Sequence, residues 1–158
     1  MLSSKRETEA ASRAAVPSFL RSRVRSIAEV RARLQRRGDS PRQVAAQLRQ
    51  YRVLGLLDDG AAARLWADHW ARQGYAAAAI RLKLLQKGFP DALVGSILNQ
   101  DYPPADDEAR AGAWLARRAR SRAAHPARSR LARALASRGF DAELIERLLG
   151  ESSDHDQR

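Results

Sequence analysis

The sequence predicts an all-α protein built from a repeated helical unit. Alanine and arginine, which favour helices, dominate the composition, whereas valine, isoleucine, threonine and aromatic residues are scarce. Apolar residues recur at helical spacing, and the same pattern of residues surrounds three separate glycines. With 158 residues, the chain is long enough for one domain with a sizeable core.

The repeat is defined by Gly38, Gly88 and Gly139, which lie 50 and 51 residues apart. Apolar residues occupy matching positions eight and four residues before each glycine, and six and ten residues after it. These columns are Val30, Ile80 and Leu131; Leu34, Leu84 and Leu135; Val44, Val94 and Ile145; and Leu48, Leu98 and Leu149. A cation precedes each glycine: Arg37, Lys87 and Arg138. Agreement of every column over three copies indicates an internal repeat.

Each copy predicts a helix on either side of its glycine, because apolar residues four apart lie on one helix face. The glycine suits a left-handed C-terminal cap, and the cation before it favours the helix dipole from the last turn. In the first copy, Ser26 with Glu29 predicts a capping box. Ser40 followed by Pro41 marks a second helix start.

Two copies also share a pair of aspartates followed by a tryptophan. Asp58-Asp59 precedes Trp66, and Asp106-Asp107 precedes Trp114, with the same spacing of eight. The aspartates fit helix N-termini as caps and dipole partners better than they fit acid–base catalysis. The matching positions of Trp66 and Trp114 predict core packing for both. Trp70 has no such match and stays open between core packing and base stacking.

Along the chain, these signals predict nine helices in three groups of three. The expected helices are 10–24, 26–37, 41–53, 59–73, 76–87, 90–99, 107–123, 127–138 and 141–149. The three-helix repeats are expected at 10–57, 58–101 and 106–150, between disordered polar tails at 1–9 and 151–158. Tyr102-Pro103-Pro104 separates the second repeat from the third. Stacking of the repeats predicts an elongated, curved array, of either hand.

The composition argues against most enzyme and metal chemistry. Cysteine is absent, which excludes a disulfide scaffold, a thiolate metal site, an iron–sulfur cluster and a cysteine nucleophile. His69, His125 and His155 share no ligand spacing, and the nine glycines form no phosphate-binding loop. We therefore expect no catalytic residue, no cofactor and no metal.

The chain is expected to be a cytoplasmic, monomeric protein. No stretch approaches the ~18 consecutive apolar residues of a transmembrane helix. The first residues are polar and lack the apolar region of a signal peptide. Nothing in the apolar pattern suggests a coiled-coil seam.

The net charge of +11, with 26 arginines and 3 lysines, indicates an anionic partner such as nucleic acid or an acidic protein face. No acidic residue occurs between Glu108 and Asp141, whereas this window holds nine arginines. The candidate binding residues in the window are Arg117, Arg118, Arg120, Arg122, Arg128, Arg130 and Arg133. Matching cations of the first two copies are also candidates, as one continuous surface: Arg31 with Arg81, and Arg33 with Lys83.

In their order and spacing, several motifs resemble the regulatory protein RecX family. The matching residues are Ser26, Glu29, Val30, Leu34 and Gly38; Gly55-Leu56-Leu57-Asp58-Asp59; Gln73-Gly74-Tyr75 leading into Ile80-Arg81; Gln86-Lys87-Gly88-Phe89; and Arg138-Gly139-Phe140. The resemblance covers roughly residues 20–150. Two positions depart from the family pattern, because small residues at 61–63 replace a common aromatic residue and Ala76 replaces a common glycine.

The resemblance implies a fold of tandem three-helix units and a function that composition alone does not supply. RecX proteins regulate the bacterial recombinase RecA in DNA repair, homologous recombination and the SOS response. They bind the RecA–DNA filament, in its groove or at its end, and lower ATPase activity, filament extension and strand exchange. The implied partners are the RecA filament, single-stranded DNA and, as a further option, double-stranded DNA. No family motif fixes individual contacts, so the candidate cations rest on charge.

Other functions fit the same residues. A stand-alone, sequence-nonspecific helical DNA- or RNA-binding protein would use the same arginine runs. An adaptor that docks on an acidic protein would need neither nucleic acid nor RecA. An enzyme has the weakest basis, because no set of polar residues is expected to converge.

Overall fold

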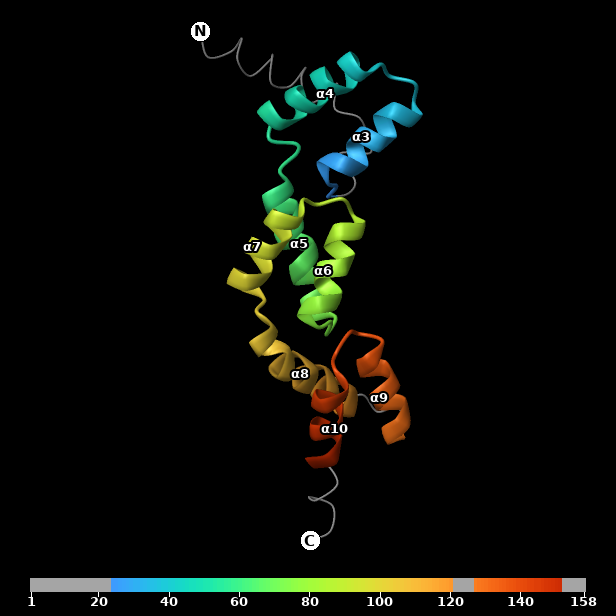
Figure 1. Ribbon diagram of the computed structural model, residues 1–158, viewed down its shortest axis with the longest axis vertical. Coiled ribbons are helices and arrows are strands. Elements are labelled where there is room, and N and C mark those ends of the chain that lie inside the picture. Colours follow the sequence, from blue (N-terminus) through green and yellow to red (C-terminus); the bar gives the residue numbers. More distant parts are fainter. Residues whose placement is uncertain (1–23, 121–126, 152–158) are drawn as a thin grey trace. The chain divides into compact units, whose positions relative to one another are not determined.

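The computed structural model describes residues 24–120 and 127–151, which form helices and no strand (Figure 1). The α-helices are α3 (Ile27–Arg36), α4 (Pro41–Val53), α5 (Asp59–Arg72), α6 (Ala77–Gln86), α7 (Asp91–Asp101), α8 (Asp107–Arg120), α9 (Arg128–Ala136) and α10 (Ala142–Glu151). A short 3-10 helix, η1 (Pro104–Asp106), precedes α8. The all-α prediction is thereby confirmed.

The chain divides into two compact units, 1–62 and 63–158. The boundaries and curvature expected for three repeats stay predictions. The expected helix at 10–24 lies outside the described residues except for Val24, as does the tail at 1–9. The tail expected at 151–158 also lies outside them, except that Glu151 is the last residue of α10. Within the described ranges, no helix has the length and apolar character needed to cross a membrane.

Three helix pairs, α3–α4, α6–α7 and α9–α10, are each joined by a turn that contains a left-handed glycine. The φ angles of Gly38, Gly88 and Gly139 are 94°, 80° and 87°. In each turn, the backbone amide of the residue after the glycine donates a hydrogen bond to a leucine carbonyl. The acceptor is the leucine four residues before the glycine: Leu34, Leu84 or Leu135. This is the hydrogen bond of a Schellman cap, and it confirms the predicted turns.

The apolar columns of the repeat form the core of these pairs. All of their members expose at most 7% of their surface, except Leu131, which is partly buried. Phe89 and Phe140, directly after their glycines, are 3% and 5% exposed and extend the same cores. Each fully buried aliphatic or aromatic side chain contributes about 1.5–3 kcal/mol to stability. The repeat pattern therefore identified the core positions correctly.

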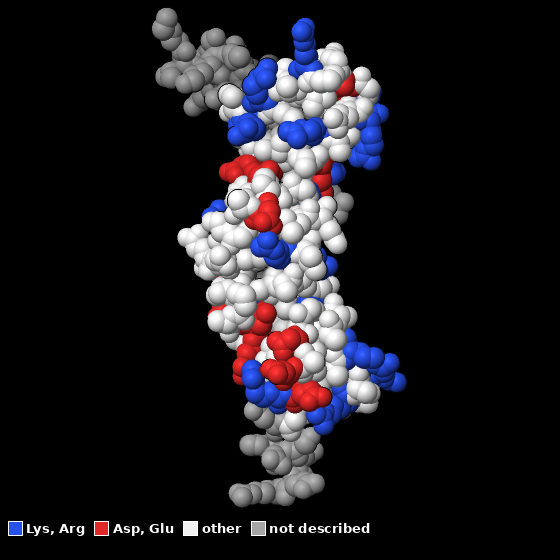
Figure 2. Space-filling model, in the orientation of Figure 1, with Lys and Arg blue, Asp and Glu red and all other residues white. Residues whose placement is uncertain are grey.

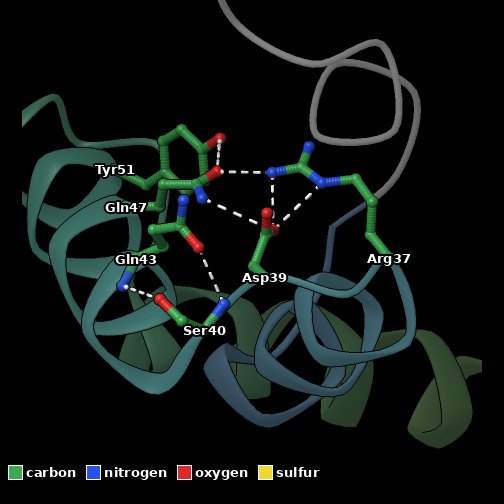
Figure 3. Close-up of polar contacts among 6 residues, drawn as sticks. All are labelled: Arg37, Asp39, Ser40, Gln43, Gln47 and Tyr51. Atoms are coloured by element: carbon green, nitrogen blue, oxygen red, sulfur yellow. Dashed lines mark hydrogen bonds and ion pairs between the residues drawn. The ribbon is translucent and has the colours of Figure 1, made fainter.

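The α3–α4 turn carries a polar network in place of the buried phenylalanine. Asp39 follows Gly38, and its Oδ2 accepts hydrogen bonds from Arg37 Nη2 at 2.6 Å and Nε at 3.0 Å (Figure 3). Gln47 Oε1 accepts from Arg37 Nη2 at 3.0 Å and from the Tyr51 hydroxyl at 3.4 Å. Burial raises the pKa of Tyr51, which keeps its hydroxyl a donor.

The predicted helix starts are capped by side chains. Ser26 and Glu29 form the expected capping box at α3, and Ser40 and Gln43 form another at α4 (Figure 3). At the start of α5, Asp58 Oδ1 accepts from the amide of Ala61 at 3.0 Å. Each of these bonds satisfies a backbone donor that has no partner within its helix.

The second aspartate of each pair caps a different helix from the one it begins. Asp59 Oδ1 accepts from the amide of Ile27 at 2.8 Å, at the start of α3. Asp107 Oδ1 accepts from the amide of Ala77 at 2.9 Å, at the start of α6. The capping prediction thus holds, but the carboxylates join helix starts that lie 32 and 30 residues apart in sequence.

The carboxyl group of Asp59 accepts the Ile27 hydrogen bond from a partly desolvated position. Burial raises its pKa, against the lowering effects of the Ile27 amide and Arg52. Because the folded state binds this proton more tightly than the unfolded chain, stability from this group falls as pH rises from the unfolded to the folded pKa. Asp59→Asn should therefore retain or raise stability near neutral pH and flatten this decline, whereas Asp59→Ala should cost about 1–2 kcal/mol. Urea unfolding at acidic and neutral pH measures both, and equal losses for the two variants would contradict the acceptor role.

Candidate nucleic-acid interface

The candidate arginines of the acid-free window lie on two helices of the unit 63–158. Arg117, Arg118 and Arg120 are exposed on the last turns of α8. Arg128, Arg130 and Arg133 are exposed on α9, the next helix in the chain. Figure 2 shows cationic side chains projecting along the edge where α9 runs, and acidic side chains gathered over α8 and α10. Arg122 lies outside the described residues.

None of these six arginines pairs with a carboxylate in the part of the chain that the structure describes. Three of them donate to backbone carbonyls instead: Arg117 to Arg72 at 3.1 Å, Arg120 to Ala116 at 3.3 Å and Arg133 to Ser129 at 3.3 Å. A guanidinium has five N–H donors, so these contacts leave most of its capacity for a phosphate or carboxylate.

The start of α8 is different, because its arginine is neutralised. Arg110 Nη2 donates to Asp107 Oδ1 at 2.6 Å and to the carbonyl of Pro103 at 2.9 Å. Glu108, on the same turn, pairs with Arg147 of α10 at 2.7 Å. Charge on α8 is therefore separated, with paired carboxylates at its beginning and arginines without carboxylate partners among the described residues at its end.

Trp114 anchors α8 to the two neighbouring turns. Its side chain is buried against Gly74 in the turn between α5 and α6. Gly74 has a φ of 78°, and a Cβ there would lie 2.6 Å from Trp114 Cδ1. The Arg138 guanidinium, from the turn between α9 and α10, lies 4.4 Å from the Trp114 ring centroid. The carbonyl of Arg138 also accepts from the amide of Ala76 at 3.0 Å. These contacts hold the helix that carries the arginines.

The cations at matching repeat positions do not share one environment. Arg31 and Arg33 are exposed on α3 in the unit 1–62, where Figure 2 shows several cationic side chains. In the unit 63–158, Arg81 pairs with Asp91 at 2.5 Å, and Lys83 Nζ lies 4.4 Å from the ring centroid of Tyr75. The continuous surface expected from these four residues stays a prediction.

The tryptophan prediction is confirmed for Trp114 and wrong for Trp66. Trp114 is 8% exposed, whereas Trp66 is only partly buried. Trp66 stacks on Trp70 with ring centroids 5.3 Å apart, and Lys87 Nζ lies 3.8 Å from the ring centroid of Trp66. Two turns of the chain cover Trp114, whereas Trp70 and Lys87, which contact Trp66, are themselves partly exposed side chains.

The cations before the glycines have a role that the sequence did not reveal. The repeat placed Lys87 and Arg138 in the last turn of a helix, beside the dipole. In the structure, each also lies over a tryptophan of an earlier helix. Arg138 Nε is buried without a hydrogen-bond partner among the described residues, so the indole face compensates part of that burial.

Among residues 24–120 and 127–151, no group of three or more histidines and carboxylates is placed to hold a metal ion. His69 contacts the edge of Trp66, with centroids 5.8 Å apart. His125 and His155 lie outside the described residues.

The fold is that of RecX crystal structures. The chain matches the structure of RecX from Lactobacillus salivarius with a TM-score of 0.62 and 17% identity, over 92% of this chain and 96% of that one. It also matches a crystal structure of regulatory protein RecX with a TM-score of 0.61 and 21% identity, over 90% of this chain and 71% of that one. No family model and no curated protein matches the sequence. The resemblance to RecX found in the motifs is thus confirmed at the level of the fold.

The contact between Gly74 and Trp114 can be tested by adding one methyl group. Gly74→Ala places a Cβ within 2.9 Å of three side-chain atoms of Trp114 at a left-handed φ, so it should destabilise the protein by about 1–3 kcal/mol or more. Gly112→Ala is the matched control, because its Cβ meets nothing within 4 Å inside α8. That substitution should stabilise the protein by roughly 0.5–1 kcal/mol. Thermal unfolding followed by circular dichroism measures both, and equal shifts would refute the close packing.

Proposed function

We propose that this chain is a RecX-type regulatory protein that binds the RecA–DNA filament and lowers its activity. The observation that carries the proposal is the RecX fold over nine-tenths of the chain, at 92% and 90% coverage. The RecX-like motifs support it independently, because they are patterns of residue types rather than of backbone geometry.

The proposed binding surface is the arginine group of α8 and α9. A nucleoprotein filament presents phosphates and acidic side chains over a long surface, and guanidinium groups bind both through paired N–H donors. The arginines without carboxylate partners among the described residues are therefore suited to many weak contacts rather than one tight site. Such binding weakens as salt rises, because each phosphate contact releases counterions, and the logarithm of affinity falls by about 0.7–0.9 per contact for each tenfold rise in salt.

In this proposal the chain acts by occupancy and supplies no catalytic group. ATP hydrolysis and strand exchange are reactions of the recombinase, and a bound regulator lowers them by blocking filament growth or by coating the filament groove. Blocking at an end requires few molecules per filament, whereas coating requires near-stoichiometric amounts. The amount of protein needed for inhibition therefore distinguishes the two modes.

A stand-alone nucleic-acid-binding protein is the second candidate, and the same arginine group favours it. Such a protein would inhibit RecA only by sequestering DNA. Its effect would disappear when DNA is added in excess.

The deciding assay is the DNA-dependent ATPase of the cognate RecA, with this protein titrated at fixed salt and DNA in excess. We expect inhibition that persists with excess DNA. Reversing the charges of Arg117, Arg118 and Arg120 to glutamate should raise the concentration needed by at least about tenfold, since several polyanion contacts are lost. The matched control reverses Arg36, Arg42 and Arg49, which are exposed on α3 and α4, and makes the same change in net charge.

Two outcomes would contradict the proposal. Full recovery of ATPase on adding DNA would favour sequestration by a plain nucleic-acid binder. Equal effects of the two triple variants would show that net charge, rather than the α8 surface, determines binding. Far-ultraviolet circular dichroism confirms that each variant keeps its helices.

A further inference from the structure

Aromatic rings and cations form one continuous series of contacts in the unit 63–158. The series begins with Lys87 over Trp66 at 3.8 Å and the stacked pair of Trp66 and Trp70 at 5.3 Å. Lys83 Nζ then lies 5.6 Å from the Trp70 centroid and 4.4 Å from that of Tyr75. Together with Arg138, Trp114 and Arg118, these five residues make a set of eight that we call the aromatic ladder.

The second half of the aromatic ladder leads to the arginine group of α8. Arg138 Cζ lies 5.8 Å from the Tyr75 centroid and 4.4 Å from that of Trp114. Arg118 Cζ lies 5.8 Å from Trp114. All of these distances fall within the range of about 6 Å for a cation–π contact. The ladder therefore includes all three tryptophans of the sequence and joins α5 and α6 to the proposed binding surface.

The two ends of the ladder differ in exposure. Trp114 is buried under Gly74, so that end is part of the packing between turns. Trp66, Trp70 and Tyr75 are partly exposed, and so are Lys83 and Lys87. Leu65, next to Trp66 on α5, is 58% exposed. The indole pair therefore lies at a surface, with two ammonium groups within 5.6 Å of its ring centroids.

We propose that the Trp66–Trp70 pair, with Lys83 and Lys87, is a binding site for single-stranded nucleic acid. An unpaired base stacks on the partly exposed indole of Trp70, and the phosphates on either side of that base are bound by the two lysines. This combination of rings and cations is what sequence-tolerant single-strand binding sites use. The proposal deepens the proposed function and rests on it only for its setting, a filament formed on DNA.

The chemistry favours a single strand over a duplex or a protein. Bases in a duplex are stacked on one another and present no free face to an indole, so a duplex would meet only the arginines. An acidic peptide would satisfy the cations but offers no reason for two tryptophans stacked beside them at the surface. Among the described residues, Lys83, Arg118 and Arg138 pair with no carboxylate, so the ladder keeps the charge that a phosphate backbone requires.

The ladder connects the proposed single-strand site to the arginines of α8. Bases held at Trp66 and Trp70 lie at one end, and Arg118 of the α8 arginine group lies at the other. A strand that runs over the surface from the indole pair to Arg118 would contact both groups of residues at once. Stacking and phosphate binding would then act on the same strand.

The test is fluorescence anisotropy with labelled oligo(dT) of about 20 nucleotides, and with a duplex of equal length, at fixed salt. Trp70→Leu keeps an apolar side chain but removes the ring, and should weaken oligo(dT) binding by about 5- to 100-fold, the loss of one stacked base. Its affinity for the duplex should stay within about twofold, because the arginines are intact. Trp70→Phe should restore most of the loss, and Leu65→Ala, an exposed apolar change one position before Trp66, should change neither affinity.

Each outcome is decisive once thermal unfolding shows that the variants are folded. An unchanged oligo(dT) affinity for Trp70→Leu, or an equal loss for oligo(dT) and duplex, overturns the proposal. The RecA ATPase assay on the same variant distinguishes failure of the single-strand site from failure of the proposed function. If Trp70→Leu loses inhibition but keeps oligo(dT) affinity, the indoles contact the recombinase and the single-strand site is wrong. If wild-type protein binds oligo(dT) through Trp70 but does not inhibit RecA, the site stands and the proposed function fails.

Discussion

The left-handed glycine turn is the constraint on which the rest of the structure depends. Each helix pair closes because Gly38, Gly88 or Gly139 adopts a positive φ and lets the chain reverse within three residues. The reversal brings the apolar columns of two short helices face to face. A helix of ten residues has little stability in isolation, so the pairing supplies most of what keeps it folded.

Polar and aromatic contacts, in addition to the aliphatic side chains of the core, hold helices to more distant parts of the chain. Asp59 accepts a hydrogen bond from the first amide of α3, 32 residues earlier in the chain. Asp107 accepts one from the first amide of α6, 30 residues earlier. Trp114 fills the space left by the missing side chain of Gly74, and Arg138 lies over its ring. Hydrogen bonds and close ring contacts have strict geometry, so these few residues set where α8 lies.

The same set of aromatic and cationic residues therefore serves structure at one end and surface chemistry at the other. Trp114 and Arg138 are part of the packing, while Trp66, Trp70 and the two lysines remain partly exposed. Repeated positions can diverge in this way because the glycine turn and the core columns maintain the fold. Asp39 is another example, since a polar network occupies the place of Phe89 and Phe140 without opening the α3–α4 turn.

The sequence by itself determined the helices, their glycine turns and the core columns. These features depend on local geometry and on which face of a helix is apolar, and both are written in the spacing of residues. It also placed the arginines of α8 and α9 on helices, as a run without acidic residues. Only the tertiary structure decided which helix start Asp59 and Asp107 cap, that Trp66 is partly exposed while Trp114 is buried, and that Lys87 and Arg138 lie over indoles. Those outcomes depend on approaches between residues that are 21 to 40 positions apart, and no local pattern encodes such distances.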